Sequence, residues 1–327
     1  LSRFEKQSKI NQVYEKHMRS LSKDSLLDLD KEIKDWVENR IKELKYLEFT
    51  VINKVSVNDG KITPESNGNV PGGIINQFSL DENKDVLRIA TTTNPLFSQF
   101  VDQSTSKNNV YALDEDLKII GALEGLAEGE RIFSTRFIGD RLYMVTFRQV
   151  DPFFVIDLSN PKDLKELGKL KIPGFSRYLH PYDENTIIGL GQDSTDQGRA
   201  TGLKISLFDV SDVSNPKEVA KYTSGIDYSS SVAEYEHKAF LFSKEKNLLV
   251  IPFYSYSYGP FIEEGMPEGA DGGDISVVKS ESFPASRGYN GALVFEIKKN
   301  SITVRGLIDH SKGDKGYYYS SLMERSL

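Results

Sequence analysis

The stretch that decides the fold is Phe154-Val155-Ile156-Asp157, followed by the turn Leu158-Ser159-Asn160-Pro161-Lys162 and a second apolar run at 167–172. β-Branched and aromatic residues favour strands, and Asn-Pro within a polar cluster marks a turn. The stretch therefore predicts two antiparallel strands joined by a turn that begins at an acidic residue. The same unit recurs at 110–114, 206–209 and 293–296, with a degenerate copy starting at 49.

A second unit, made of a strand, a tight turn and another strand, lies upstream of each full copy of the first. Its copies occupy 76–91, 134–146, 177–190 and 238–252. Helical periodicity does not return after residue 47, so we expect antiparallel strands only. A four-stranded antiparallel unit repeated about every 40 to 60 residues is the signature of a β-propeller blade. The predicted fold class is mainly β: a β-propeller of four-stranded antiparallel blades, as a partial or small ring, preceded by an α-helical hairpin.

The chain divides into a helical segment at 1–47 and blades at 48–327. The helical segment contains no Gly or Pro, and its apolar residues recur at spacings of three and four, as in amphipathic helices. These helices either dock on the rest of the chain or bind a partner. The predicted blades are a half blade at 48–70, whole blades at 73–128, 131–174, 175–227 and 231–311, and a half blade at 317–327. The half blades either close a small ring or belong to a longer propeller.

Composition excludes several classes of protein. Acidic residues outnumber basic ones, 48 against 41, which argues against a nucleic-acid binder. The absence of cysteine excludes disulfides and thiolate chemistry. No apolar run is long enough to span a bilayer, and no nucleotide-binding motif follows a strand. The chain shows no signal peptide, and its first residue, Leu1, suggests a trimmed or partial chain.

Specific segments resemble a known family. Residues 139–161 and 171–185, with support from 76–82, 88–92 and 237–242, resemble the secreted β-propeller domain family of prokaryotes. The resemblance covers about 70–315, and the charged helical segment is similar to an insertion in these proteins. It implies a secreted or cell-surface protein of which this chain is the C-terminal part. It implies nothing about mechanism.

Candidate binding residues fall on the predicted innermost strands, which line the central channel of a propeller. A polar ring there suits a small anion or a metal, with imidazole as ligand or general base. The alternative is that these side chains are polar only because they face water. The channel candidates are Gln77, Arg136, Arg177, His180, Glu236 and His237.

The insertion at 253–290 supplies a second set of candidates. Its aromatic residues, Tyr254, Tyr256, Tyr258 and Phe261, suit either a partner-binding surface or the packing of an edge strand. A Gly-rich acidic stretch follows, and a bound Ca²⁺ would order it. Its candidate ligands are Glu263, Glu264, Glu268, Asp271 and Asp274. The acidic run at 81–85 instead has a counterpart at 183–185, which favours a hairpin turn over a calcium loop.

Two functional hypotheses follow. The first is an extracellular, non-enzymatic binding or scaffolding module that contacts a protein or cell-surface component through the helical hairpin and the loops at 192–201 and 253–290. The second is a hydrolase or metal-assisted enzyme with its site at the channel mouth near His180 and His237. The sequence contains no Gly-x-Ser-x-Gly motif, which would have supported a hydrolase. Ca²⁺ is the one cofactor that the sequence suggests.

Overall fold

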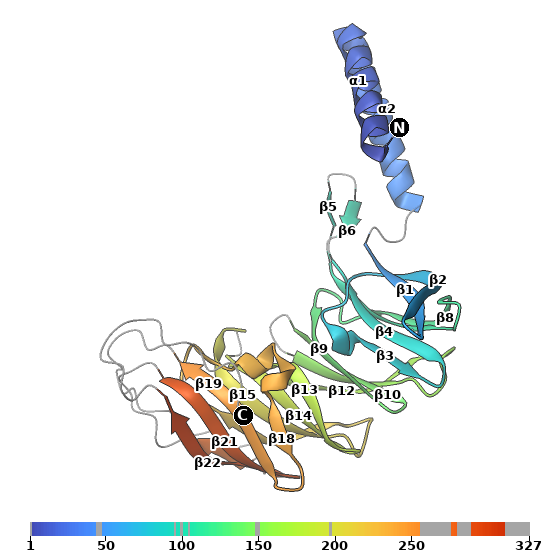
Figure 1. The fold of residues 1–327 in the computed structure, drawn as a ribbon. Coiled ribbons are helices and arrows are strands. Elements are labelled where there is room, and N and C mark those ends of the chain that lie inside the picture. Colours follow the sequence, from blue (N-terminus) through green and yellow to red (C-terminus); the bar gives the residue numbers. More distant parts are fainter. Residues whose placement is uncertain are drawn as a thin grey trace. The chain divides into compact units, whose positions relative to one another are not determined.

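The computed structural model of the protein describes residues 2–43, 48–94, 96–98, 101–103, 105–147, 151–195, 198–255, 276–279 and 289–310. The chain forms two compact units. One joins residues 1–47 to 95–105, and the other comprises 48–94 and 106–327. Figure 1 labels most of their helices and strands.

The smaller unit contains the two expected helices, α1 (Arg3–Ser20) and α2 (Lys23–Glu43). A capping box starts α1, because the Glu5 amide donates to Ser2 Oγ while the Ser2 amide donates to Glu5 Oε2. The insertion between two strands of the first sheet adds β5 (Leu96–Ser98) and β6 (Val101–Gln103), and β6 contacts α2. The sequence did not reveal that this insertion would associate with the helices.

The larger unit contains a two-stranded sheet, which comes first in the chain, and four larger sheets. The hairpin is β1 (Phe49–Asn58) with β2 (Lys61–Pro71). The first sheet contains β3 (Leu80–Asn83), β4 (Val86–Thr93), β7 (Lys107–Leu113) and β8 (Ile119–Leu126). The second contains β9 (Arg131–Ile138), β10 (Arg141–Phe147), β11 (Asp151–Asp157) and β12 (Lys165–Ile172).

The third and fourth sheets complete the unit. The third contains β13 (Phe175–Asp183), β14 (Thr186–Ser194), β15 (Ala200–Asp209), β16 (Lys217–Thr223) and β20 (Ser276–Lys279). The fourth, here called the last sheet, contains β17 (Ser229–Ser230), β18 (Leu241–Ser243), β19 (Leu248–Ser255), β21 (Tyr289–Lys298) and β22 (Ser301–Asp309). The predicted fold class is confirmed: four-stranded antiparallel sheets dominate, two helices precede them, and the sheets of the described residues do not close into a ring.

Two local expectations were wrong. Strand β20 pairs with β16 in parallel, whereas the sequence predicts antiparallel strands only. Parallel pairing needs a long connection, and β20 follows a long insertion rather than a tight turn. In addition, part of the innermost layer is not strand but 3₁₀ turn: η1 (Gln77–Ser79), η2 (Val232–Glu234) and η3 (His237–Ala239). Hydrogen bonds from the backbone to polar capping side chains stabilise these turns. In η1, for example, Asn76 Oδ1 accepts a hydrogen bond from the Phe78 amide.

The repeated acidic residue at the end of the third strand has a local cause. Asp157 Oδ1 accepts a hydrogen bond from the Ser159 amide at 2.9 Å, and Asp209 accepts in the same way from Ser211 at 2.9 Å. Asp114 bonds the amide of Asp116 at 3.0 Å. An acidic side chain that bonds the backbone two residues on stabilises a turn, so the acidic residue starts each connection to the fourth strand.

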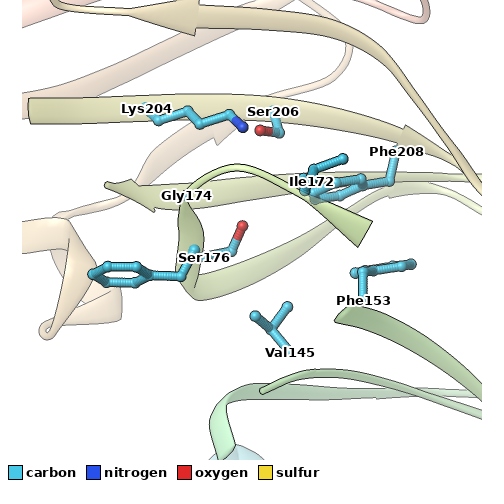
Figure 2. A pocket seen from close by; sticks show the side chains of 9 residues that line it. Val145, Phe153, Ile172, Gly174, Ser176, Lys204, Ser206 and Phe208 are labelled. Atoms are coloured by element: carbon cyan, nitrogen blue, oxygen red, sulfur yellow. The ribbon is translucent and has the colours of Figure 1, made fainter. Parts of the chain in front are cut away.

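Neighbouring sheets pack face to face. Consecutive residues of β10 show this, because Met144 belongs to the core shared with the first sheet and Tyr143 to the core shared with the third. Between the second and third sheets, the rings of Phe153 and Phe208 stack at 4.5 Å. Figure 2 shows this junction, where a cavity with room for about one water molecule lies beside Lys204. Lys204 Nζ is ion-paired with Glu218 at 3.0 Å.

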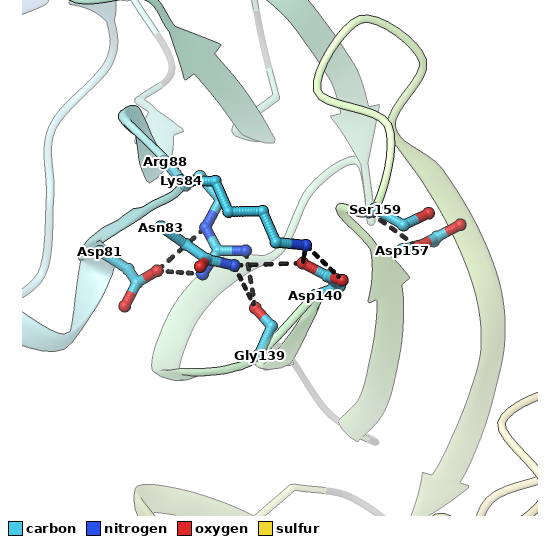
Figure 3. Close-up of polar contacts among 8 residues, drawn as sticks. All are labelled: Asp81, Asn83, Lys84, Arg88, Gly139, Asp140, Asp157 and Ser159. Carbon is cyan, nitrogen blue, oxygen red and sulfur yellow. Dashed lines mark hydrogen bonds and ion pairs between the residues drawn. The ribbon is translucent and has the colours of Figure 1, made fainter.

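Polar contacts join the first and second sheets at their turns (Figure 3). The buried Arg88 bonds Asp81 and the Gly139 carbonyl oxygen, while Lys84 Nζ lies 3.0 Å from Asp140 Oδ2. Lys84 and Asp85 have φ of 55° and 62°, as in a tight hairpin turn. The acidic run at 81–85 is therefore a hairpin turn, as its recurrence suggested.

Candidate functional site at the inner edges of the sheets

Inner elements of all four large sheets meet in one group of side chains, which we call the axial cluster. Gln77 and Phe78 come from η1, before the first sheet; Arg136 comes from β9 of the second; Tyr178 and His180 come from β13 of the third; His237 comes from η3, before β18 of the last. Of the six channel candidates, the structure brings Gln77, Arg136, His180 and His237 into this cluster, Glu236 to its margin, and Arg177 into a different environment.

Arg136 is the centre of the cluster. Its Nε donates to the Leu179 carbonyl oxygen at 3.0 Å, and its Nη2 donates to the Tyr178 hydroxyl at 3.0 Å. The guanidinium lies 4.3 Å from the centre of the Phe78 ring, a cation–π arrangement. Among the described residues, no carboxylate forms an ion pair with it.

His180 lies next to Tyr178 on the same strand. A guanidinium only donates hydrogen bonds, so the Tyr178 oxygen accepts from Arg136. The same oxygen lies 3.2 Å from His180 Nδ1, and the tautomer of His180 decides which of these two groups donates. Burial, and after it the positive charge of Arg136, lower the pKa of His180 to about 4. Burial raises the pKa of Tyr178, so both groups are neutral at pH 7.

The first and last sheets meet at Gln77 and His237. Gln77 Nε2 lies 3.2 Å from His237 Nδ1, and the His237 ring packs edge-on against Phe78 with centroids 5.1 Å apart. Glu236 lies beside them, with its Oε1 3.8 Å from His237 Nδ1, but the same oxygen also caps η3 by accepting from the Lys238 amide. The cluster is thus polarised, with a guanidinium on one side and a carboxylate at its margin.

Arg177 belongs to a second group, the Glu234 cluster. The Glu234 side chain is fully buried, and its Oε2 lies 3.4 Å from Arg177 Nε, so the two charges are paired without a well-formed hydrogen bond. Glu234 Oε1 accepts from Gln192 Nε2 at 2.8 Å and from Ser230 Oγ at 2.6 Å. The Arg177 guanidinium also lies over the Phe175 and Tyr235 rings. These partners join the third sheet to the last one, which is a structural role.

Most of the candidate residues in the insertion at 253–290 lie outside the described residues. Tyr254 lies in β19 and is partly buried. Tyr256, Tyr258, Phe261 and the proposed calcium ligands Glu263, Glu264, Glu268, Asp271 and Asp274 lie outside the described residues, as does the half blade at 317–327. Within the described ranges, no three His, Asp or Glu side chains come close enough to hold a metal ion. No described helix is long and apolar enough to cross a membrane.

Sequence reasoning missed three members of these groups. Tyr178 had a signal, because it lies two residues before His180 on the same strand and therefore shares its face. Phe78 and Glu234 had none, because both lie in or beside 3₁₀ turns and meet residues from other sheets.

Four-stranded antiparallel sheets that pack face to face, with inner edges converging on one cluster, define a β-propeller type of protein. The chain belongs to the β-propeller domain family, whose model matches residues 14–327. This match includes most of the helical segment.

Two archaeal proteins are similar in sequence, and both are uncharacterised. One, from Methanocaldococcus jannaschii, is 40% identical over 260 residues, which are 79% of this chain and 40% of the relative. The other, from Archaeoglobus fulgidus, is 40% identical over 258 residues, 77% of this chain and 38% of the relative. The chain therefore spans about two fifths of the length of the curated relatives it matches.

Solved structures are similar only weakly. The N-terminal domain of Nup159 has a TM-score of 0.36 at 11% identity, over 75% of this chain and 50% of that chain. Sqt1 from Chaetomium thermophilum has a TM-score of 0.34 at 15% identity, over 53% of this chain and 40% of that chain. These likenesses carry no argument about function.

Proposed function

We propose that this chain is a propeller-type binding module that receives an anionic group of a protein partner, such as a carboxylate, at the axial cluster. The proposal rests on the environment of the Arg136 guanidinium. Its guanidinium is held by the Leu179 carbonyl, the Tyr178 hydroxyl and the Phe78 ring, and no described carboxylate neutralises it. A guanidinium stays charged at all physiological pH values and matches carboxylate geometry, so a fixed and unpaired one favours an anionic ligand.

The same residue argues against a metal as the ligand. A metal ion at His180 would have to lie near the permanent positive charge of Arg136, which already lowers the pKa of that imidazole. Metal-binding histidines are usually oriented by a carboxylate or carbonyl acceptor. His180 Nδ1 instead forms its hydrogen bond with the Tyr178 hydroxyl.

Binding is also favoured over catalysis. A general base works best when its pKa is near the working pH, and the pKa of His180 is about 4. Tyr178 has a raised pKa, so its hydroxyl is a poor nucleophile at neutral pH. The enzyme hypothesis therefore has no support from the contacts around His180.

The location outside the cell is part of the proposal. It rests on the resemblance of 139–161 and 171–185 to secreted propeller proteins. The loops around 192–201 and 253–290 are the proposed outer rim of the contact surface. Labelling of intact cells with a membrane-impermeant amine reagent tests the location, because a cytoplasmic protein would stay unlabelled while a cell-surface protein would react.

The binding proposal is tested with an acidic peptide that ends in a free carboxylate and with its amidated twin. Binding is measured by calorimetry on the unmodified protein, on Arg136→Met and on the control Arg131→Met. Arg131 lies on the same strand and is exposed, so the control removes equal charge outside the cluster. Hydrogen bonds to charged groups contribute about 1.5 to 3 kcal/mol, so Arg136→Met should weaken binding of the acidic peptide at least about tenfold.

The control should bind as tightly as the unmodified protein, and the amidated peptide should bind more weakly to both. Equal affinity for the two peptides would overturn the proposal, as would equal losses in the two arginine variants. A stoichiometric transition metal in the purified protein, found by elemental analysis, would instead favour the metal-assisted enzyme.

A further inference from the structure

The fourth strand of each sheet has one position at which a turn of the neighbouring sheet can pack. This position directly follows the β-bulge of the fourth strand. Its partner on the third strand lies two residues before the acidic residue that starts the turn. Gly121 in β8 pairs there with Ala112, and Gly168 in β12 pairs with Val155. In the last sheet, Gly306 of β22 pairs with Val294. We call this position the glycine seat.

Two of these seats are filled by the next sheet along the chain. A Cβ at Gly121 would collide with the carbonyl oxygen of Pro161, and a Cβ at Gly168 with that of Val213. Pro161 and Val213 lie in the turns between the third and fourth strands of the next sheet. Glycine is needed here because the incoming backbone occupies the place of a side chain. Gly68 in β2 receives Leu117 of the first sheet in the same manner.

The seat in the last sheet has no occupant among the described residues. No described residue lies within 4 Å of the position that a Cβ would take at Gly306. Part of the surrounding face is apolar, because Gly306, Val294, Val250 and Leu241 form one cross-strand row. The same face also carries Glu296 and the fully buried Ala292. Leu241 is 44% exposed, and Ile308, two residues along β22 on the same face, is 46% exposed. The equivalent faces of the first, second and third sheets are buried in cores.

The length of the incoming turn distinguishes the possible occupants. The filled seats Gly121 and Gly168 receive turns of seven residues, 158–164 and 210–216. In the third sheet the same position is Ala220, and the adjacent last sheet has only a two-residue turn, 299–300. A glycine seat therefore goes with a long turn. The β1–β2 hairpin also has a two-residue turn, 59–60, so neither this hairpin nor the same hairpin of a second copy fits Gly306.

We propose that the last sheet is the docking face for one further blade, supplied by a longer form of this protein, whose long turn between its third and fourth strands enters the seat at Gly306. The curated relatives have the necessary length, because this chain spans about 40% of each. The blade would cover Leu241 and Ile308 as the second and third sheets cover each other.

The test compares this chain with the full-length gene product. Gly306→Ala should leave the melting temperature of the chain unchanged or slightly higher, because the site is open and alanine restricts the unfolded chain. In the full-length protein the same substitution should lower the melting temperature. Gly168→Ala is the matched control, and it should lower the melting temperature in both proteins because its seat is filled in both.

A second measurement covers the case in which a full-length variant fails to fold. The chain has no cysteine, so Ile308→Cys introduces a unique thiol on the docking face. Its alkylation should be fast in the chain and slower by at least about tenfold in the full-length protein, whereas the exposed control Lys246→Cys should react fast in both. Equal reactivity of Cys variants at 308 in both proteins, with a harmless Gly306→Ala, would overturn the proposal. Protection in the chain alone would also overturn it: protection that grows with protein concentration would identify a second copy, and constant protection a cover within this chain.

Discussion

Two arginines on inner strands of neighbouring sheets differ in whether a carboxylate is paired with them. Arg177 on β13 faces the fully buried carboxylate of Glu234, which three further groups also hold. Arg136 on β9 is fixed by a carbonyl, a hydroxyl and an aromatic ring, and has no described acidic partner. The two residues look alike in sequence. Their difference teaches that the partner from the adjoining sheet decides whether an inner-strand arginine holds the fold or faces a ligand.

The strongest test of this contrast is to remove the buried carboxylate. Glu234→Ala leaves Arg177 without its counter-charge and Gln192 without its acceptor. Breaking a buried ion pair on one side costs about 3 to 5 kcal/mol, so the free energy of unfolding should fall by about that much. Urea denaturation measures it, with the shape-conserving Glu234→Gln as a milder control. A loss below about 1 kcal/mol would mean that this cluster is not structural.

The next effect is a pH dependence of stability that arises from His180, beside Arg136. The pKa of His180 is about 4 in the folded protein and about 6.5 when unfolded, so the unfolded chain binds more protons between these values. Stability should therefore fall as the pH drops from about 6.5 to 4, by at most about 3 kcal/mol from this residue, and His180→Gln should reduce the slope.

A nuclear magnetic resonance titration of His180 sharpens the comparison. Because the positive charge of Arg136 contributes to the lowered pKa, Arg136→Met should raise the pKa of His180. Arg177→Met should leave it unchanged. If both variants move it equally, the two arginines do not differ as described.

A smaller change is expected for the stability of Arg136→Met itself. The variant loses two hydrogen bonds and the cation–π contacts with Phe78 and Tyr178, but no described buried carboxylate loses a partner. The net loss should be about 1 to 2 kcal/mol in urea denaturation, below that of Glu234→Ala. A loss as large as that of Glu234→Ala would show that Arg136 is structural and would remove the basis for a ligand.

The smallest effect should come from an exposed ion pair that also joins two sheets. Lys84 is exposed and Asp140 is partly exposed, and the hydrogen bond from Lys84 lowers the pKa of Asp140. Lys84→Met should raise the pKa of Asp140, read from its carboxyl resonance, and leave the melting temperature almost unchanged. A large drop in melting temperature would show that an ion pair contributes to stability because it joins two sheets, even when it is not buried.

The sequence was sufficient for the sheets because their signals are local. An aspartate such as Asp157 bonds the amide two residues later, so each turn leaves a visible mark at a fixed place after a strand. The helices were equally visible from apolar residues spaced along α2. The 3₁₀ turns and the parallel strand β20 were not, because capping side chains and long connections decide them.

The site could be predicted only in part. Inner-strand position was enough to select Gln77, Arg136, His180 and His237, which the fold brings together. It could not separate Arg177 from them, because Glu234 arrives from a different sheet. Blade boundaries, the calcium loop and the cell-surface location stay predictions.

The last sheet has a consequence for how the molecule comes apart. Outside the axial cluster, the described sheets pack their faces on neighbouring sheets. A stack of this kind resembles a one-dimensional array, and such arrays fray from the end that lacks a neighbour. The amide hydrogens of β21 and β22 should therefore exchange with solvent sooner than those of β10 and β11, which lie between two layers.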